Sequence, residues 1–130
     1  MPKRVLSIGQ CGPDDAALRR LLARHFDVEI HSADLPDEAL RKTAEVAYDL
    51  VLVNRKLDAD YSDGLEIIRA LKARPETSGL PVMLITNYEE HHAQAMASGA
   101  ERGFGKLEYG RAETIERLSR FLAAKPTAAP

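Results

Sequence analysis

The sequence has little of what would place the protein in a specialised class. Its one cysteine, Cys11, excludes a disulfide within the chain and favours a reducing compartment. No apolar run reaches the roughly 18 residues that a membrane-spanning helix needs, and the apolar stretch after the basic start is too short for a signal peptide. The formal net charge of −2 gives no reason to expect nucleic acid or an anionic membrane as a partner. We expect a cytoplasmic protein.

What the sequence does contain fits one globular domain. Its 130 residues are 45% hydrophobic and 29% charged, which suits a single folded core rather than a disordered chain. Alanine, proline and threonine dominate the end of the chain, a composition typical of linkers. We therefore expect a domain over residues 1–122 and a linker-like tail over residues 123–130.

Short runs of branched apolar residues alternate with longer segments that have helical spacing. The strand candidates are residues 5–8, 28–30, 50–53, 82–85 and a short one near Phe104. Five strands alternating with five helices predict an α/β fold: a doubly wound parallel sheet of flavodoxin-like order 2-1-3-4-5, with helices on both faces. Ligands bind such sheets at the carboxyl ends of the central strands. The segments to inspect are therefore 9–13, 54–58, 86–87 and 105–107.

Four of the segments around these positions resemble the response-regulator receiver family of two-component signalling. They are residues 49–54 (DLVLVN), 63–68 (DGLEII), 81–86 (PVMLIT) and 99–106 (GAERGFGK). Together they extend the resemblance from about Lys3 to Leu122. No single segment is specific, but their order and spacing are.

The resemblance implies a particular chemistry. In the family a carboxylate attacks a phosphoryl group, and a Mg²⁺ ion held by oxygen ligands, including two acids after the first strand, neutralises the charge. A hydroxyl and a lysine then contact the phosphoryl oxygens. By position, Thr86 and Lys106 retain these last two roles.

The other positions depart from the family pattern. Asn54 stands at the phosphoacceptor position, and its neutral amide cannot form the mixed anhydride that a carboxylate forms with phosphate. Gly9 and Gln10 stand at the acid-pair positions and supply no charge, so Mg²⁺ binding is expected to be lost. Gly103 stands where the family has its switch aromatic. We expect no catalytic residue, no bound metal, no cofactor and no enzymatic activity.

Other acids lie close enough in sequence to be candidates for a rescue of the site. They are Asp58, Asp14 and Asp15. The simpler interpretation is that Asp14 or Asp15 caps the first helix and that Asp58 is solvated. Lys106, without a phosphate, is then expected to bond the side-chain carbonyl of Asn54 or a backbone carbonyl, or to turn towards Asp58.

Cys11 and the adjacent pair His91 and His92 are the remaining candidates for chemistry. Cys11 lies near the start of a helix, where a thiol pKa can fall, but no second cysteine is present to resolve an oxidised form. Neighbouring histidines on a helix point about 100° apart and do not chelate a metal as an i, i+4 pair does. They are expected on the surface of the fourth helix.

These observations predict a protein-interaction module in or beside two-component signalling, with a conformation set by sequence rather than by phosphate. The resemblance implies that a protein partner or a second copy docks on the face made by the fourth helix, fifth strand and fifth helix. We expect that face to contain Tyr88, His92, Ala95, Glu101, Arg102, Arg111 and Glu113. Two alternatives stay open: a phosphate-switched receiver with a rearranged acid cluster, and a small-molecule or redox sensor at the vacated pocket.

Overall fold

A five-stranded parallel sheet of order β2-β1-β3-β4-β5 forms the centre of the protein, as the sequence predicts. The structure is a computed structural model and describes residues 2–125. The strands are β1 (Lys3–Ile8), β2 (Val28–Ala33), β3 (Leu50–Asn54), β4 (Val82–Ile85) and β5 (Glu101–Phe104). β3 and β4 are apolar along nearly their whole length because both of their faces are covered.

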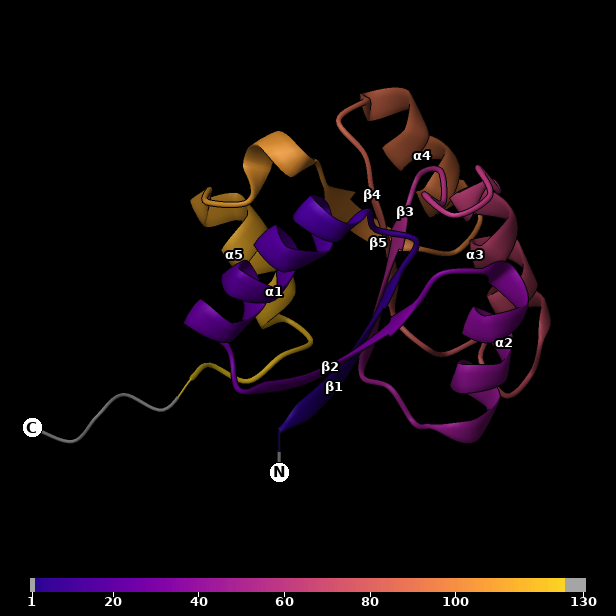
Figure 1. The fold of residues 1–130 in the computed structure, drawn as a ribbon, viewed down its shortest axis with the longest axis horizontal. Coiled ribbons are helices and arrows are strands. Elements are labelled where there is room, and N and C mark those ends of the chain that lie inside the picture. The colour runs from indigo at the N-terminus through magenta and orange to yellow at the C-terminus, as the bar shows by residue number, and fades with distance from the viewer. Residues whose placement is uncertain (1, 126–130) are drawn as a thin grey trace, which may run out of the picture.

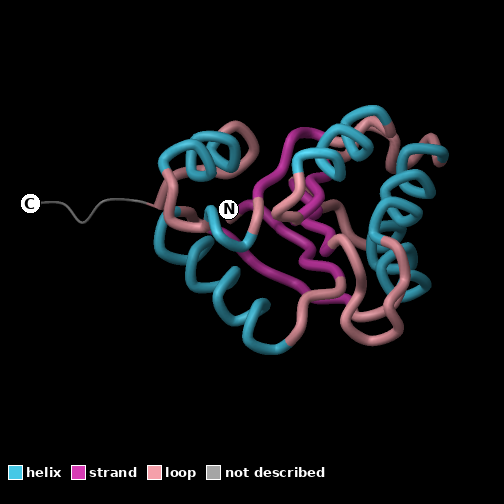
Figure 2. The backbone as a smooth tube through the Cα atoms, turned by 90° about the horizontal axis from the view of Figure 1, so that it is seen from above, coloured by secondary structure: helices cyan, strands magenta, loops and turns pink. Residues whose placement is uncertain are grey.

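Helices cover both faces of this sheet (Figures 1 and 2). They are α1 (Gly12–His25), α2 (Pro36–Glu45), α3 (Gly64–Ala73), α4 (Glu89–Ala97) and α5 (Ala112–Ser119), and a short 3-10 helix, η1 (Lys106–Glu108), precedes the last. Figure 1 shows α1 and α5 on one face and α2, α3 and α4 on the other. Within residues 2–125, no helix combines the length and the apolar composition that crossing a bilayer requires.

Alternate residues of the central strands supply two separate apolar cores. Leu6, Val51 and Val53 point towards the helices α2, α3 and α4. Leu50 and Leu52 point towards α1 and α5. The period-two alternation of a strand divides these side chains between the two layers, so the sheet is held rigidly from both sides. Its carboxyl edge is therefore a firm platform for the loops that follow each strand.

The end of the described chain is attached to the domain. The backbone N–H of Asp27 donates to the carbonyl of Ala123, and the N–H of Lys125 donates to the carbonyl of His25. Ala124 also forms an antiparallel bridge with Phe26. Backbone hydrogen bonds thus join residues 123–125, the first part of the predicted tail, to the fold. The rest of the predicted tail, residues 126–130, lies outside the described residues.

Candidate functional site

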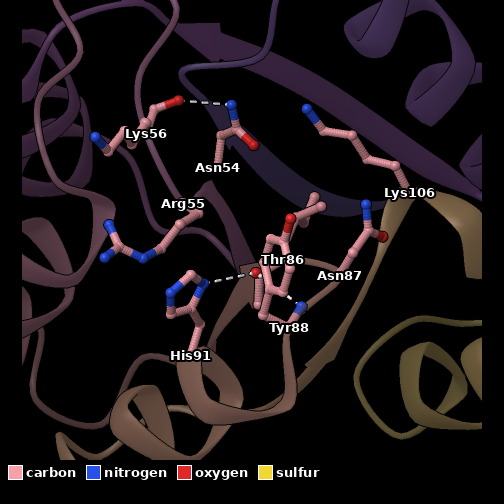
Figure 3. A pocket seen from close by; sticks show the side chains of 9 residues that line it. Asn54, Arg55, Lys56, Thr86, Asn87, Tyr88, His91 and Lys106 are labelled. Atoms are coloured by element: carbon pink, nitrogen blue, oxygen red, sulfur yellow. Dashed lines mark hydrogen bonds between the residues drawn. The ribbon is translucent and has the colours of Figure 1, made fainter.

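The loops at the carboxyl edge of the sheet enclose a cavity of about 530 Å³, which we call the cation-lined cavity. It lies over the ends of β3, β4 and β5 (Figure 3). Its lining residues are Asn54, Arg55, Lys56, Ile85, Thr86, Asn87, Tyr88, His91 and Lys106. Strand order predicted this location from the sequence. The fold brings Asn54, Thr86 and Lys106 together at this one cavity, as expected.

The amide of Asn54 is fixed at the end of β3 by two backbone carbonyls. Its Nδ2 donates to the carbonyl of Lys56 at 2.7 Å and to the carbonyl of Gly9 at 3.2 Å. Both N–H groups of the amide are therefore used, and Figure 3 shows the side-chain oxygen on the side of the cavity. Asn54 acts here as a structural bracket that joins the end of β3 to the loop after β1.

Gly9 has a conformation and surroundings that suit only glycine. Its φ is +77°, and a Cβ placed on it would lie 2.5 Å from Cγ of Leu57. Its carbonyl accepts from the backbone N–H of Asp58 at 3.0 Å, in addition to Asn54. A larger residue here would have to displace Leu57 and strain the backbone, so an acid cannot simply replace Gly9.

A second and smaller cavity of about 300 Å³ adjoins the first on the side of β1 and β2. We call it the acid-lined cavity, and its lining residues are Ser7, Gly9, Gln10, Gly12, Asp15, Ser32, Ala33, Asp34, Asp58 and Ala59. Gln10 is only 8% exposed, and both polar atoms of its amide lack a hydrogen-bond partner within residues 2–125. Two of the rescue candidates, Asp15 and Asp58, thus line this cavity rather than the one that contains Asn54.

The third rescue candidate, Asp14, meets Lys106. The Nζ of Lys106 lies 2.5 Å from Oδ2 of Asp14, and about a third of each side chain is exposed. The Lys106 hydrogen bond, helped by Cys11, holds the pKa of the Asp14 carboxyl below its ordinary value of 3.8. The expected partners of Lys106 were therefore wrong. So was the expected helix cap, because Cys11 is the N-cap residue of α1 and makes no side-chain cap bond, while Asp14 and Asp15 lie in the first turn.

Thr86 joins the end of β4 to the start of α4 through its hydroxyl. Its Oγ1 lies 3.0 Å from Nδ1 of His91 and accepts from the backbone N–H of Tyr88 at 3.2 Å (Figure 3). The expected surface placement is wrong for His92, which is only 3% exposed, whereas His91 is half-buried in the cavity wall. Burial lowers the pKa of His92 below its ordinary value of 6.5. Ala95, also expected on the surface, is buried.

Gly103 lies against the neighbouring strand so closely that it has no room for a side chain. A Cβ there would lie 2.0 Å from the backbone oxygen of Leu84, next to an irregularity in the β4–β5 pairing. The nearby aromatic pair is Phe104 and Tyr109, whose rings meet edge to face at 5.8 Å. The Tyr109 hydroxyl is buried without a partner within residues 2–125, and burial raises its pKa. Sequence reasoning missed Tyr109, although it is one of few aromatic residues.

The acids and histidines of the described chain do not converge. Within residues 2–125, no three His, Cys, Asp or Glu side chains lie close enough together to hold a metal ion. The carboxylates nearest the carboxyl edge are divided instead: Asp14 binds Lys106, and Asp15 bonds Ser7 and Arg19. What this edge offers chemically is a cavity of cations and hydrogen-bond donors beside a separate cavity of acids.

Comparison with known families and proteins points in one direction. The model of the response regulator receiver domain family matches residues 14–115, a segment that begins after Gly9 and Gln10. The transcriptional regulatory protein ResD of Bacillus subtilis is 30% identical over 93 residues, which cover 68% of this chain. The matched segment spans only 37% of the length of ResD.

Solved structures share the fold at low sequence identity. A putative response regulator from Chloroflexus aurantiacus superposes with a TM-score of 0.80 at 19% identity, and the match covers 93% of this chain and 98% of that one. The receiver domain of a sensor histidine kinase from Pseudomonas aeruginosa, described with a magnesium ion in its active-site cleft, gives a TM-score of 0.76 at 17% identity. That match also covers 93% of this chain and 98% of the other.

Proposed function

This chain belongs to the response regulator receiver domain family, and we propose that it is a signalling domain that works without phosphorylation at residue 54. The observation that carries the proposal is the state of Asn54. Its amide is neutral, and both of its N–H groups are bound to the carbonyls of Gly9 and Lys56. An amide in this position has neither the charge nor the free orientation of a nucleophile.

The donor set around Asn54 does not fit Mg²⁺, the ion that the family implies. Mg²⁺ requires hard oxygen ligands in near-octahedral geometry and is usually held by one or two carboxylates. Here Gly9 has no side chain, Gln10 faces the acid-lined cavity, and the Lys56 carbonyl already accepts from Asn54. We therefore propose that the domain does not recruit Mg²⁺ at this edge, and we derive no phosphoryl-transfer step.

A phosphate-independent domain would act through a protein surface, and we propose the α4–β5–α5 face with a second copy as the partner. Leu107 is 81% exposed and Tyr88 63% exposed beside this face. Leu107 also lines a cavity of about 290 Å³ together with Arg111 and Glu108. The ion pair of Arg102 with Glu89 links β5 to α4 there. An exposed apolar side chain surrounded by charged groups fits the arrangement of an apolar centre and a polar rim in a protein interface.

Incubation with acetyl phosphate and Mg²⁺, read by intact-protein mass, tests the first part of the proposal. We expect no adduct with the mass of one phosphoryl group. We expect the same result for Asn54→Asp, because the metal-holding acids would still be absent. An adduct that disappears at alkaline pH, as an acyl phosphate does, would contradict the proposal.

Sedimentation velocity tests the second part. We expect the share of dimer to be unchanged by acetyl phosphate and to fall in Leu107→Asp, because the new charge would have to be desolvated in the interface. Leu35→Asp is the matched control, since Leu35 is 45% exposed at the start of α2, away from this face. Equal behaviour of the two variants would contradict docking through Leu107.

One observation favours a phosphate-switched alternative. Asp14 is the one carboxylate within the described chain that contacts Lys106, so a phosphoryl group on Asp14 would meet a cation. Peptide mapping of any adduct distinguishes the cases: a label on Asp14 that is lost in Asp14→Asn would support the rearranged receiver.

A further inference from the structure

We propose that the cation-lined cavity is a non-covalent site for a small organic phosphate monoester, which binds by taking Lys106 from Asp14. The proposal concerns binding only and goes beyond the question of phosphorylation. It rests on the charge of the cavity, its unpartnered donors, its size and the position of the Lys106–Asp14 pair.

The charged lining of this cavity has one sign. Its charged residues are the cations Arg55, Lys56 and Lys106, and none of its lining residues within the described chain is an acid. Lys56 makes no ion pair with any of residues 2–125. A concave site with cations and low-dielectric walls concentrates a positive potential and attracts an anion.

Hydrogen-bond donors without partners accompany the cations. The side-chain oxygen of Asn87 accepts from the backbone N–H of Leu107 at 3.3 Å, and its NH₂ group, which lies beside Lys106 (Figure 3), donates to none of residues 2–125. Nε of Arg55 is buried and has no partner within residues 2–125. Gly105 makes the position of Asn87 possible, because a Cβ on it would lie 2.2 Å from the Asn87 oxygen. Phosphate oxygens are acceptors that such donors satisfy.

The acids that balance the cavity's cations lie outside its lining. Arg55 pairs with Asp63 at 2.9 Å, and Lys106 pairs with Asp14 at 2.5 Å. A ligand oxyanion can replace Asp14 as the partner of Lys106, because Lys106 itself forms part of the cavity wall. Asp14 is thus a competitor for the ligand, built into the first turn of α1.

Two features select the kind of anion. The side-chain oxygen of Asn54 is an acceptor beside the cavity, and it can receive a hydrogen bond from a hydroxyl group on the organic part of a ligand, which a bare inorganic anion does not have. The volume of about 530 Å³ lies in the range of roughly 300–1,000 Å³ that holds organic ligands. Tyr88 and Ile85 supply apolar wall for an organic body.

Titration of the full chain with phenyl phosphate, inorganic phosphate and benzyl alcohol, followed by NMR of the backbone amides, tests the site. We expect phenyl phosphate to bind most tightly and to shift the signals of Lys56, Thr86 and His91. Inorganic phosphate should bind more weakly, and benzyl alcohol should not bind. Equal binding of benzyl alcohol would overturn the anion site, and equal binding of inorganic phosphate would overturn the organic ligand.

Two variants that change the charge of neighbouring residues make the test sharper. Asp14→Asn frees Lys106, so phenyl phosphate should bind about tenfold more tightly, the effect of one charge-assisted hydrogen bond. Asp15→Asn is the matched control: it removes the same charge one residue later, but Asp15 lines the other cavity and pairs with Arg19. Equal tightening in both variants would show a general charge effect and overturn the competition.

Removal of the cation gives the opposite result. Lys106→Met should weaken phenyl phosphate binding about tenfold. A gain of affinity in Asp14→Asn cannot come from misfolding, so the pair of variants remains decisive even if Lys106→Met is unstable. Unchanged affinity in both would overturn the proposal. Binding is measured without a phosphodonor or Mg²⁺, so its failure is distinct from that of the proposed function.

Discussion

The two cavities at the carboxyl edge are joined by the hydrogen bond between Asn54 and Gly9 but carry opposite charge. Among the residues that the structure describes, the cavity over β3, β4 and β5 is lined by cations and no acid. The cavity over β1 and β2 is lined by Asp15, Asp34 and Asp58 and by no lysine or arginine. The carbonyl of Gly9 lies at the boundary, because it accepts from Asn54 on one side and from Asp58 on the other.

The acids of this edge are segregated in one cavity rather than missing. The resemblance to receivers implies a site where acids and a lysine act on one phosphoryl group. Here Lys106 and the hydroxyl of Thr86 line the cation-lined cavity, while most of the acids line the acid-lined cavity. Within residues 2–125, Asp14 is the acid that bonds to Lys106, the lysine of the cation-lined cavity.

A substitution of Gly9, the residue at the boundary between the two cavities, should have the largest effect on stability. In Gly9→Ala the new methyl group would clash with Leu57, and the alanine backbone would have to adopt the left-handed conformation. The clash and the backbone strain together should lower the unfolding free energy by about 2–4 kcal/mol. Urea denaturation measures the loss. Gly12→Ala is the control, because no atom lies within 4 Å of a Cβ at Gly12. Equal stability of Gly9→Ala and wild type would show that the boundary yields easily.

The bracket at Asn54 is the next way to break the division. Asn54→Asp replaces two donated hydrogen bonds with a carboxylate that faces the carbonyls of Gly9 and Lys56, and should cost about 1–3 kcal/mol in urea denaturation. Asn87→Asp is the matched control, because the Asn87 oxygen is an acceptor and aspartate keeps that role. A larger loss in Asn87→Asp would contradict this account.

Loss of the ion pair between Lys106 and Asp14 should have a smaller effect on stability, and this effect should depend on pH. Lys106→Met should cost about 1 kcal/mol at neutral pH, because both ends of the ion pair are a third exposed. The folded pKa of Asp14 is depressed, so its contribution is complete above the ordinary value of 3.8 and is lost as the pH falls through the folded pKa. Urea midpoints of wild type and variant should therefore converge below pH 3.8.

A double-mutant cycle with Asp14→Asn isolates the pair from other effects of the methionine. The coupling between Lys106 and Asp14 should stabilise the protein at neutral pH and should vanish once Asp14 is protonated in wild type. A coupling that persists at the lowest pH would show that the contact is not an ion pair of Asp14.

A substitution in the acid-lined cavity, at Asp58, should have the smallest effect on stability. Asp58 is exposed, and within residues 2–125 its side chain makes no hydrogen bond or ion pair, so Asp58→Asn should change the unfolding free energy by less than about 0.5 kcal/mol. Thermal and urea denaturation both measure this. A large stabilisation would show that the segregated acids repel one another more strongly than their exposure suggests.

The fold followed from the sequence because its signals are local. Unbroken apolar runs such as residues 50–53 predict covered parallel strands, and strand order then places Asn54, Thr86 and Lys106 at one edge. Strand boundaries shifted by a few residues, as in β5, without moving any of these three positions.

The contacts within the site could not be predicted from the sequence, because they join residues that are far apart along the chain. Lys106 and Asp14 are 92 positions apart, and nothing in the sequence indicates which of several acids a lysine will meet. His92 could have been recognised as buried, since it shares a helical face with Ala95, which is also buried. Both residues were instead assigned to the docking face that the family resemblance implied, and therefore to the surface.

The bonds of Lys3 to Asp27 and of Lys125 to His25 bring both ends of the described chain to the amino edge of the sheet. Both cavities open at the opposite edge. A fluorophore or a biosensor surface can thus be attached next to either end while the mouths of the cavities stay free, which makes immobilised protein a fair substitute for protein in solution when ligands are screened.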